Sequence, residues 1–224
     1  MTVRQARSSR KGFYVALEGI DGAGKSTLRT ALGRSLRRRG LAVRLRREPV
    51  DPAIGRLAQE AGAQDPWTGA VYFTVDRHLA VARLRADLRA YDLVLSDRSF
   101  YSTLAYQGSR LPPADRVRLE ELQRRATIRP DLVVLLDLPP TWLRRRWTGR
   151  GARRAPLERV GLLEGVARAY RQLAQRGDWV VLDARQGPSV LVREATRAIL
   201  ERSGHAARPG RGKPLRPSRP RRRG

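Results

Sequence analysis

Short apolar runs alternate with longer amphipathic stretches along most of the chain. The runs are rich in valine and leucine and cover residues 13–18, 41–46, 92–97, 131–137 and 178–183. The last three are apolar almost throughout, which is typical of strands covered on both faces of a sheet. The polar and apolar spacing between the runs predicts helices over residues 25–39, 69–90, 113–127 and 158–176.

The alternation of strands and helices predicts an α/β fold. We expect three layers, in which helices flank a five-stranded parallel sheet with right-handed crossovers. Ligands of such sheets bind at the carboxyl ends of the strands. Four of the predicted strands carry an acidic residue at this edge: Glu18, Asp97, Asp137 and Asp183.

The segment GIDGAGKS, residues 19–26, fits the phosphate-binding pattern G-x-x-x-x-G-K-[ST] in full. It follows a predicted strand and opens a predicted helix, and this context indicates a P-loop NTPase fold. The glycines let successive N–H groups converge on phosphate oxygens, while Lys25 would reach the β- and γ-phosphates of ATP or GTP. The Ser26 hydroxyl would ligate Mg²⁺. We expect the nucleotide to contact Gly19, Ile20, Asp21, Gly22, Ala23, Gly24, Lys25, Ser26 and Thr27.

The loop leaves the phosphate acceptor open, because P-loop proteins include hydrolases, motors and kinases of many substrates. Asp97 and Arg98 follow the strand at residues 92–97. The carboxylate could hold Mg²⁺ through water or orient an acceptor, and the guanidinium could clamp an acceptor phosphate. The alternative is that the pair only starts a helix and faces solvent.

Phe73 and Arg77 lie four residues apart in a predicted helix and therefore share one of its faces. An aromatic ring and an arginine in this arrangement could stack on a flat base and bond its carbonyl group. They could equally be a core residue and a surface residue.

These pieces together resemble the thymidylate kinase family, over most of residues 13–200. The segment DRSFYSTLAYQG (97–108) is similar to the most specific signature of that family. The other similar segments occur in the family's order: VALEGIDGAGKST (15–27), RREP (46–49), FTVDR (73–77), RPDLVVLLDLPP (129–140), VARAYRQLA (166–174) and WVVLDA (179–184).

The resemblance implies ATP-dependent phosphorylation of dTMP to dTDP, which is a step of dTTP synthesis. Phe73 would stack on thymine, and Arg77 and Thr103 would bond the base. Arg98 and Arg47 would hold the 5′-phosphate. The resemblance also implies Mg²⁺ near Ser26 and Asp97, and a homodimer. Tyr106 would lie near the 2′ carbon of the sugar, Gln107 would line the same pocket, and Asp21 would reach the 3′-hydroxyl or the metal shell.

Residues 142–158 occupy the place of the family's mobile lid. The phosphate loop has no arginine of its own, and in the family such loops go with a lid that supplies one. We expect at least one arginine of this segment to close on the donor phosphates, with Arg150 and Arg153 as catalytic candidates beside Arg144, Arg146 and Arg154. The alternative is that these arginines are solvated.

The match is imperfect around the substrate loop and the lid. The chain reads REPVDPAIG where the family has two glycines and a threonine after its Arg-Glu-Pro, and Ala155 and Pro156 replace the Asp-Arg pair usual in the lid. Ser99 stands where an aromatic residue or histidine is common. Another nucleoside monophosphate or deoxynucleoside kinase of the same fold is therefore a second hypothesis.

The chain carries 47 Lys and Arg against 21 Asp and Glu, and only Lys11, Lys25 and Lys213 are lysine. This arginine bias is typical of a skewed genome composition. The basic segments 1–11 and 203–224 are predicted to be disordered around a kinase domain at residues 12–202. A third hypothesis is a nucleotide-binding regulatory or nucleic-acid-associated module, in which the basic tail makes a weak contact with RNA or DNA. No apolar run predicts a membrane span or signal peptide, so a cytoplasmic protein is expected.

Overall fold

The computed structural model describes residues 12–143 and 157–205. Its centre is a five-stranded sheet in the order β2-β3-β1-β4-β5, and all four neighbouring pairs are parallel. This confirms the predicted α/β fold. The strands are β1 (Phe13–Glu18), β2 (Val43–Arg47), β3 (Leu93–Asp97), β4 (Leu132–Asp137) and β5 (Val180–Asp183).

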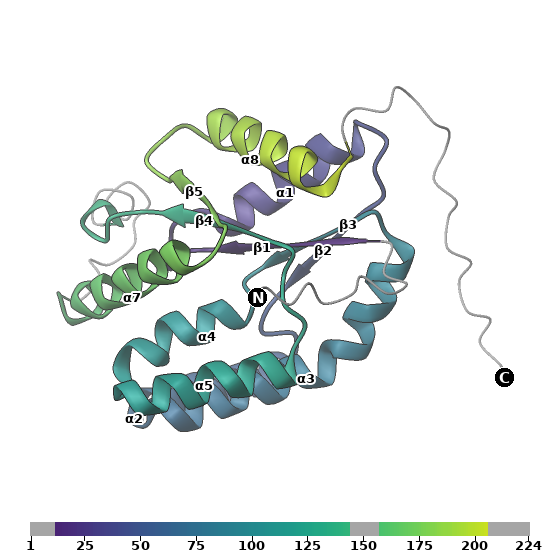
Figure 1. Cartoon of the computed structure of the whole chain (residues 1–224). Helices are drawn as coiled ribbons and strands as arrows, with labels where there is room; N and C mark the ends of the chain where they lie inside the picture. The colour runs from purple at the N-terminus through teal and green to yellow at the C-terminus, as the bar shows by residue number, and fades with distance from the viewer. Residues whose placement is uncertain (1–11, 144–156, 206–224) are drawn as a thin grey trace, which may run out of the picture.

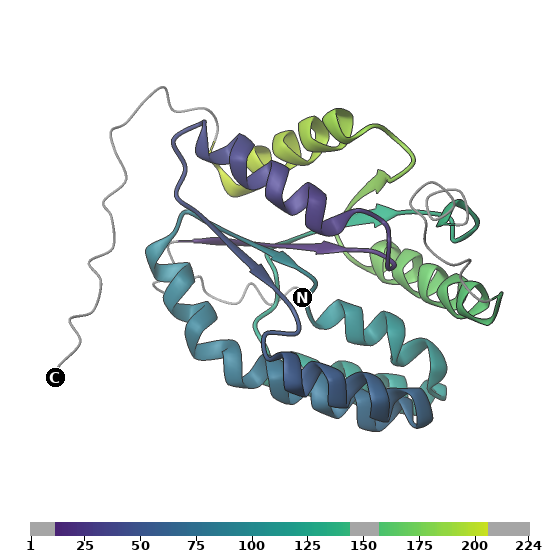
Figure 2. The ribbon, with the colours of Figure 1, turned by 180° about the vertical axis from the view of Figure 1, so that it is seen from behind.

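Helices cover both faces of the sheet and complete the three layers (Figures 1 and 2). On one face lie α1 and α8, and on the other lie α3, α4, α5 and α7, with α2 packed against α3. The helices are α1 (Lys25–Arg37), α2 (Pro52–Gln64), α3 (Pro66–Ala90), α4 (Phe100–Tyr106), α5 (Pro113–Ala126), α7 (Leu157–Arg176) and α8 (Pro188–Ser203), and a short 3₁₀ turn, η1, spans Gly108–Arg110.

Helix starts follow local capping. The Asp65 carboxylate accepts hydrogen bonds from the N–H groups of Trp67 and Thr68, and Pro66 occupies the first turn, so α3 begins before the predicted residue 69. Asp51 caps α2 in the same way. Sequence periodicity did not predict α2, α4 or α8.

The core lies between the sheet and its two helical layers. Every residue of β1 and β3 is buried, and so are five of the six residues of β4. This agrees with the apolar runs and leaves the carboxyl ends of the strands as the edge where side chains can meet a ligand.

The described residues contain no helix that is both long and apolar enough to cross a membrane. The predicted tails, residues 1–11 and 203–224, lie outside them except for residues 203–205, where α8 ends and Gly204 adopts a left-handed conformation. The division into domains, the disorder of the tails and the weak nucleic-acid contact therefore stay predictions.

Candidate active site

The phosphate loop joins β1 to α1 and needs glycine where it turns. Gly19, Gly22 and Gly24 have φ angles of 139°, 80° and 101°, a region that residues with a Cβ rarely adopt. A Cβ on Gly19 would also lie 2.6 Å from the carbonyl oxygen of Leu136. The loop ends at the N-terminus of α1, where backbone N–H groups and the helix dipole favour an anion.

Lys25 is the first residue of α1, and its side chain turns back to the phosphate loop. Its Nζ donates hydrogen bonds to the carbonyl oxygens of Gly19 (2.9 Å) and Ile20 (2.8 Å). Burial lowers the pKa of Lys25 to about 8, and the nearby Arg98 guanidinium acts in the same direction. A phosphate group at the loop would offset both effects, because its negative charge would stabilise the protonated form of Lys25.

Ser26 and Asp97 bring two oxygen atoms together between α1 and the end of β3. The Ser26 hydroxyl donates to Oδ2 of Asp97, which is buried. Oxygen donors suit Mg²⁺, which usually keeps waters and phosphate oxygens among its ligands. Within the described residues no group of three or more His, Cys, Asp or Glu could hold a metal ion alone. The pair fits a metal that is shared with a bound nucleotide.

Arg98 adopts a positive φ of 77°, which is unusual for a residue with a side chain. Its guanidinium contacts the Asp21 carboxylate, donates to Ser102 Oγ (2.9 Å) and lies 5.0 Å from the centre of the Tyr106 ring. The Tyr106 hydroxyl accepts from the backbone N–H of Asp21 (2.9 Å). The structure therefore brings the predicted residues Asp21, Arg98 and Tyr106 into one cluster beside the phosphate loop.

Sequence reasoning missed the group that holds this cluster. The fully buried Glu18 carboxylate accepts from the N–H of Ser99 (2.7 Å) and the hydroxyls of Ser99 (2.7 Å), Ser102 (2.6 Å) and Tyr170 (2.8 Å). Ser102 in turn accepts from Arg98. An acidic residue at the end of a buried strand was the available signal, but it did not reveal these partners.

Arg77 of α3 is buried and lies in a second cluster. Its Nε donates to Glu48 (2.5 Å), its Nη1 to Gln123 (3.0 Å) and its Nη2 to Thr103 (2.9 Å). Burial raises the pKa of Glu48, while the Arg77 charge opposes that shift. The predicted pair Arg77 and Thr103 is thus in contact, and Glu48 and Gln123 are additional members without a predicted role.

The other predicted residues lie on the elements around these two clusters. Arg47 is exposed at the end of β2, in register with Asp97. Phe73 is partly buried on α3, and Gln107 ends α4 with its amide close to Gly62 of α2. Asp137 and Asp183 instead pair with Arg171 and Arg185.

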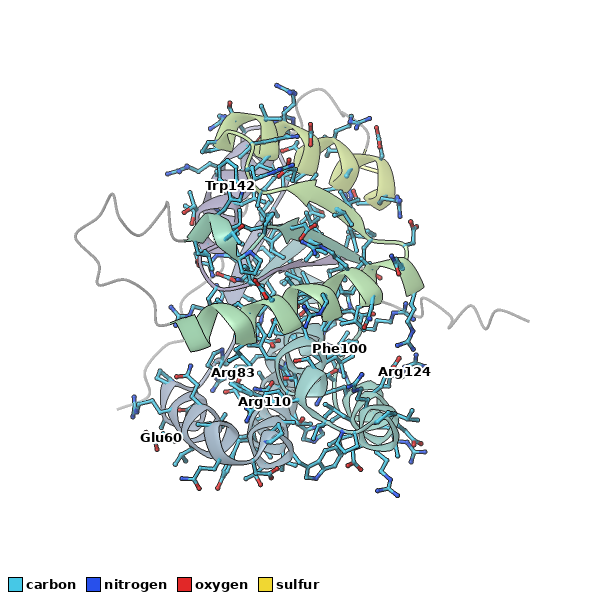
Figure 3. All side chains as sticks on the ribbon, turned by 90° about the vertical axis from the view of Figure 1, so that its left-hand side faces the viewer. Glu60, Arg83, Phe100, Arg110, Arg124 and Trp142 are labelled. Atoms are coloured by element: carbon cyan, nitrogen blue, oxygen red, sulfur yellow. The ribbon has the colours of Figure 1, made fainter. Side chains whose placement is uncertain are left out.

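The predicted lid lies mostly outside the described residues. Of its span, Trp142 and the buried Leu143 follow β4, and residues 157 and 158 belong to α7. In the view of Figure 3, Trp142 lies above helix α7, and Phe100 of α4 lies below it. The lid candidates Arg144, Arg146, Arg150, Arg153 and Arg154 all fall in the undescribed segment.

The fold and the loop define a P-loop nucleotide-binding protein with a second, arginine-bearing cluster beside the phosphate site. Residues 17–195 match the sequence profile of the family described as "Thymidylate kinase". The chain belongs to the thymidylate kinase family.

Several curated relatives agree with this assignment. A probable thymidylate kinase of Thermococcus gammatolerans is 39% identical over 177 residues, which cover 73% of this chain and 84% of the relative. The thymidylate kinase of Bdellovibrio bacteriovorus is 32% identical over 206 residues, covering 84% and 96% of the two chains. That of Synechococcus sp. WH7803 is 36% identical over 212 residues, covering 88% and 98%.

Proposed function

We propose that this protein transfers the γ-phosphoryl group of ATP to dTMP, giving dTDP and ADP. One observation carries the proposal beyond family membership. The phosphate loop follows β1 and the Asp97–Arg98 pair follows the adjacent β3, and the two segments are joined by the Ser26–Asp97 and Asp21–Arg98 contacts. Two anionic nucleotides can therefore meet at one edge of the sheet.

ATP would occupy the phosphate loop, with residues 19–27 around its phosphates and Lys25 at the β- and γ-phosphates. Ser26 and Asp97 would hold Mg²⁺ with their side-chain oxygens. The metal would offset the charge of the phosphate oxygens.

The acceptor dTMP would lie on the side of α3 and α4. Arg98, with Arg47, would bind its 5′-phosphate, because a guanidinium offers paired donors to phosphate oxygens. Phe73 would stack on thymine. The remaining contacts would come from Arg77 and Thr103 at the base, Tyr106 at the sugar's 2′ carbon, Gln107 in the pocket wall and Asp21 at the 3′-hydroxyl.

The reaction requires no protein nucleophile. A phosphate oxygen of dTMP attacks the γ-phosphorus, and ADP leaves on the opposite side. The chain's work is to align the two nucleotides, exclude water and stabilise charge through Lys25 and Arg98. Arg150 and Arg153 are proposed to add positive charge from the lid.

Dimer formation and location complete the proposal. Five of the eight large apolar side chains exposed in the described residues lie on α2 and α3: Leu57, Val71, Tyr72, Val75 and Leu79. Positions 71, 75 and 79 share one helix face. We infer a homodimer through this face and a cytoplasmic location, in keeping with nucleotide synthesis.

A coupled assay of ADP release tests the function. Purified protein with ATP and Mg²⁺ is offered dTMP, dUMP, dCMP, AMP and GMP in turn. We expect the highest kcat/KM with dTMP. Turnover of another monophosphate in place of dTMP would support the second hypothesis, and turnover of none would refute a monophosphate kinase.

A further inference from the structure

A chain of buried hydrogen bonds runs from Arg77 into the protein interior. Arg77 Nη1 donates to Oε1 of Gln123 on α5 (3.0 Å), and Nε2 of Gln123 donates to Thr74 Oγ1 (2.5 Å). The Thr74 hydroxyl donates to the carbonyl oxygen of Ala70 (2.7 Å). Gln123 is fully buried and Thr74 is nearly so.

The direction of this chain is fixed by chemistry. A guanidinium can only donate hydrogen bonds, so Gln123 must turn its oxygen toward Arg77 and its NH₂ group toward Thr74. An amide meets both demands at once. A carboxylate at this position would have no donor for Thr74 and would add a second buried negative charge beside Glu48, while an apolar side chain would leave Arg77 without an acceptor.

Three hydrogen bonds fix the plane of the Arg77 guanidinium. Arg77 donates them to Glu48, Thr103 and Gln123, which lie in three separate parts of the chain. They use three of the five guanidinium N–H groups, so among the described residues one N–H remains on each of Nη1 and Nη2. Whatever base meets this fixed plane meets donors only.

We propose that Gln123, oriented by Thr74, is a positioning residue that holds Arg77 so that the acceptor site selects bases with a carbonyl group at position 4. The inference rests on the proposed function. Thymine presents an acceptor oxygen at this position, whereas cytosine presents an amino group that would face the Arg77 donors. Unpaired polar groups of this kind give strong discrimination.

Substitutions at Thr74 and Gln123 test the proposal in the full-length protein. For each variant one measures kcat, the KM values for dTMP and ATP, and the inhibition constant of dCMP competing with dTMP. For Gln123→Leu we expect the KM for dTMP to rise about tenfold or more. The inhibition constant of dCMP divided by the KM for dTMP, here called the dCMP-to-dTMP ratio, should fall about tenfold. The KM for ATP should stay within about twofold of the parent. Thr74→Val should raise the dTMP KM and lower the dCMP-to-dTMP ratio, each by about threefold. Thr74→Ser, which keeps the hydroxyl, should restore the parental values of both.

Thr127→Val is the matched control. Its hydroxyl donates to the backbone carbonyl oxygen of Gln123 (2.8 Å), so the change removes a neighbouring hydroxyl and leaves the amide chain intact. We expect no change in the dCMP-to-dTMP ratio. If the control changes that ratio as much as Thr74→Val, the role of Gln123 is structural and the proposal is overturned.

The outcomes separate this inference from the proposed function. If the parent protein does not phosphorylate dTMP, the proposed function fails. If the parent does so, and folded Thr74→Val keeps the parental dTMP KM and dCMP-to-dTMP ratio, only the inference fails. A cooperative thermal unfolding transition shows that each variant is folded. If Gln123→Leu does not fold, the kinetic constants of Thr74→Val alone test the proposal.

Discussion

Lys25 is the residue whose ionisation has the clearest consequence. Its pKa in the free protein is about 8, below its ordinary 10.5, because it is buried and near Arg98. The unfolded chain therefore binds one more proton than the folded chain between these values. The contribution of Lys25 to the free energy of unfolding consequently rises with pH across that window and is absent below it.

The same shift predicts a pH dependence of catalysis. The value of kcat/KM for ATP should fall above about pH 8, as the free protein loses the Lys25 charge. At saturating ATP the fall in kcat should move to higher pH, because bound phosphates favour the charged amine. Initial rates from pH 6.5 to 10 check this, and identical profiles for kcat and kcat/KM would contradict it.

Glu18 gives a second prediction at the residue scale. In Glu18→Gln one carboxylate oxygen becomes an NH₂ group that faces donors of Ser99, Ser102 or Tyr170. We expect the free energy of unfolding in urea to fall by about 2–4 kcal/mol, with a loss of turnover as Arg98 loses its support.

Glu121→Gln is the control for Glu18→Gln. Glu121 forms an exposed pair with Arg125, so this change should alter the free energy of unfolding by less than about 0.5 kcal/mol. Equal effects of the two changes would refute this role for Glu18.

The sequence predicted single residues where a local motif exists. The phosphate loop and the Asp97–Arg98 pair carry their chemistry within a few positions. Glu18 and Gln123 act through partners far along the chain, since Tyr170 is 152 residues from Glu18 and Arg77 is 46 from Gln123. A single sequence does not show which residues so far apart in the chain come into contact, so these partners could be identified only from the folded structure.

At the scale of elements, strands were easier to predict than short helices. Strands buried on both faces read as apolar runs, which are rare elsewhere. Helix α2 packs through small residues, including Gly55, Ala58 and Gly62, and so shows no broad apolar stripe. Helix α4 is buried at five of its seven positions, which hides the helical period.

The close packing of α2 on α3 predicts an effect of one methyl group. A Cβ on Gly69 would lie 2.5 Å from Gly62 Cα and 2.9 Å from the Ala58 carbonyl oxygen, and both are backbone atoms that cannot rotate away. Gly69→Ala should therefore lower the free energy of unfolding by about 1–3 kcal/mol.

Gly161→Ala is the control, because a Cβ there meets no atom within 4 Å in helix α7. Greater helix propensity should raise stability by up to about 1 kcal/mol. Thermal unfolding of both variants measures the difference. A Gly69→Ala protein as stable as the parent would show that the two helices can separate without cost.

At the scale of the whole molecule, the formal charge of +26 would oppose self-association. Many arginines are paired locally, as in Arg124–Glu120 and Arg202–Asp178. The outer side of α3 instead presents aliphatic side chains. Association is therefore expected to depend on this apolar face, and a charge placed there should prevent it.

Leu79→Glu tests that expectation. Leu79 is 66% exposed, so a glutamate costs little in the monomer, but in the inferred dimer it would be an unpaired buried charge. Sedimentation velocity at micromolar concentration should show a dimer for the parent and a monomer for the variant. Val117→Glu on α5, at a residue 69% exposed, should remain dimeric. A dimeric Leu79→Glu beside a monomeric Val117→Glu would move the interface to α5, and a monomeric parent would refute the homodimer.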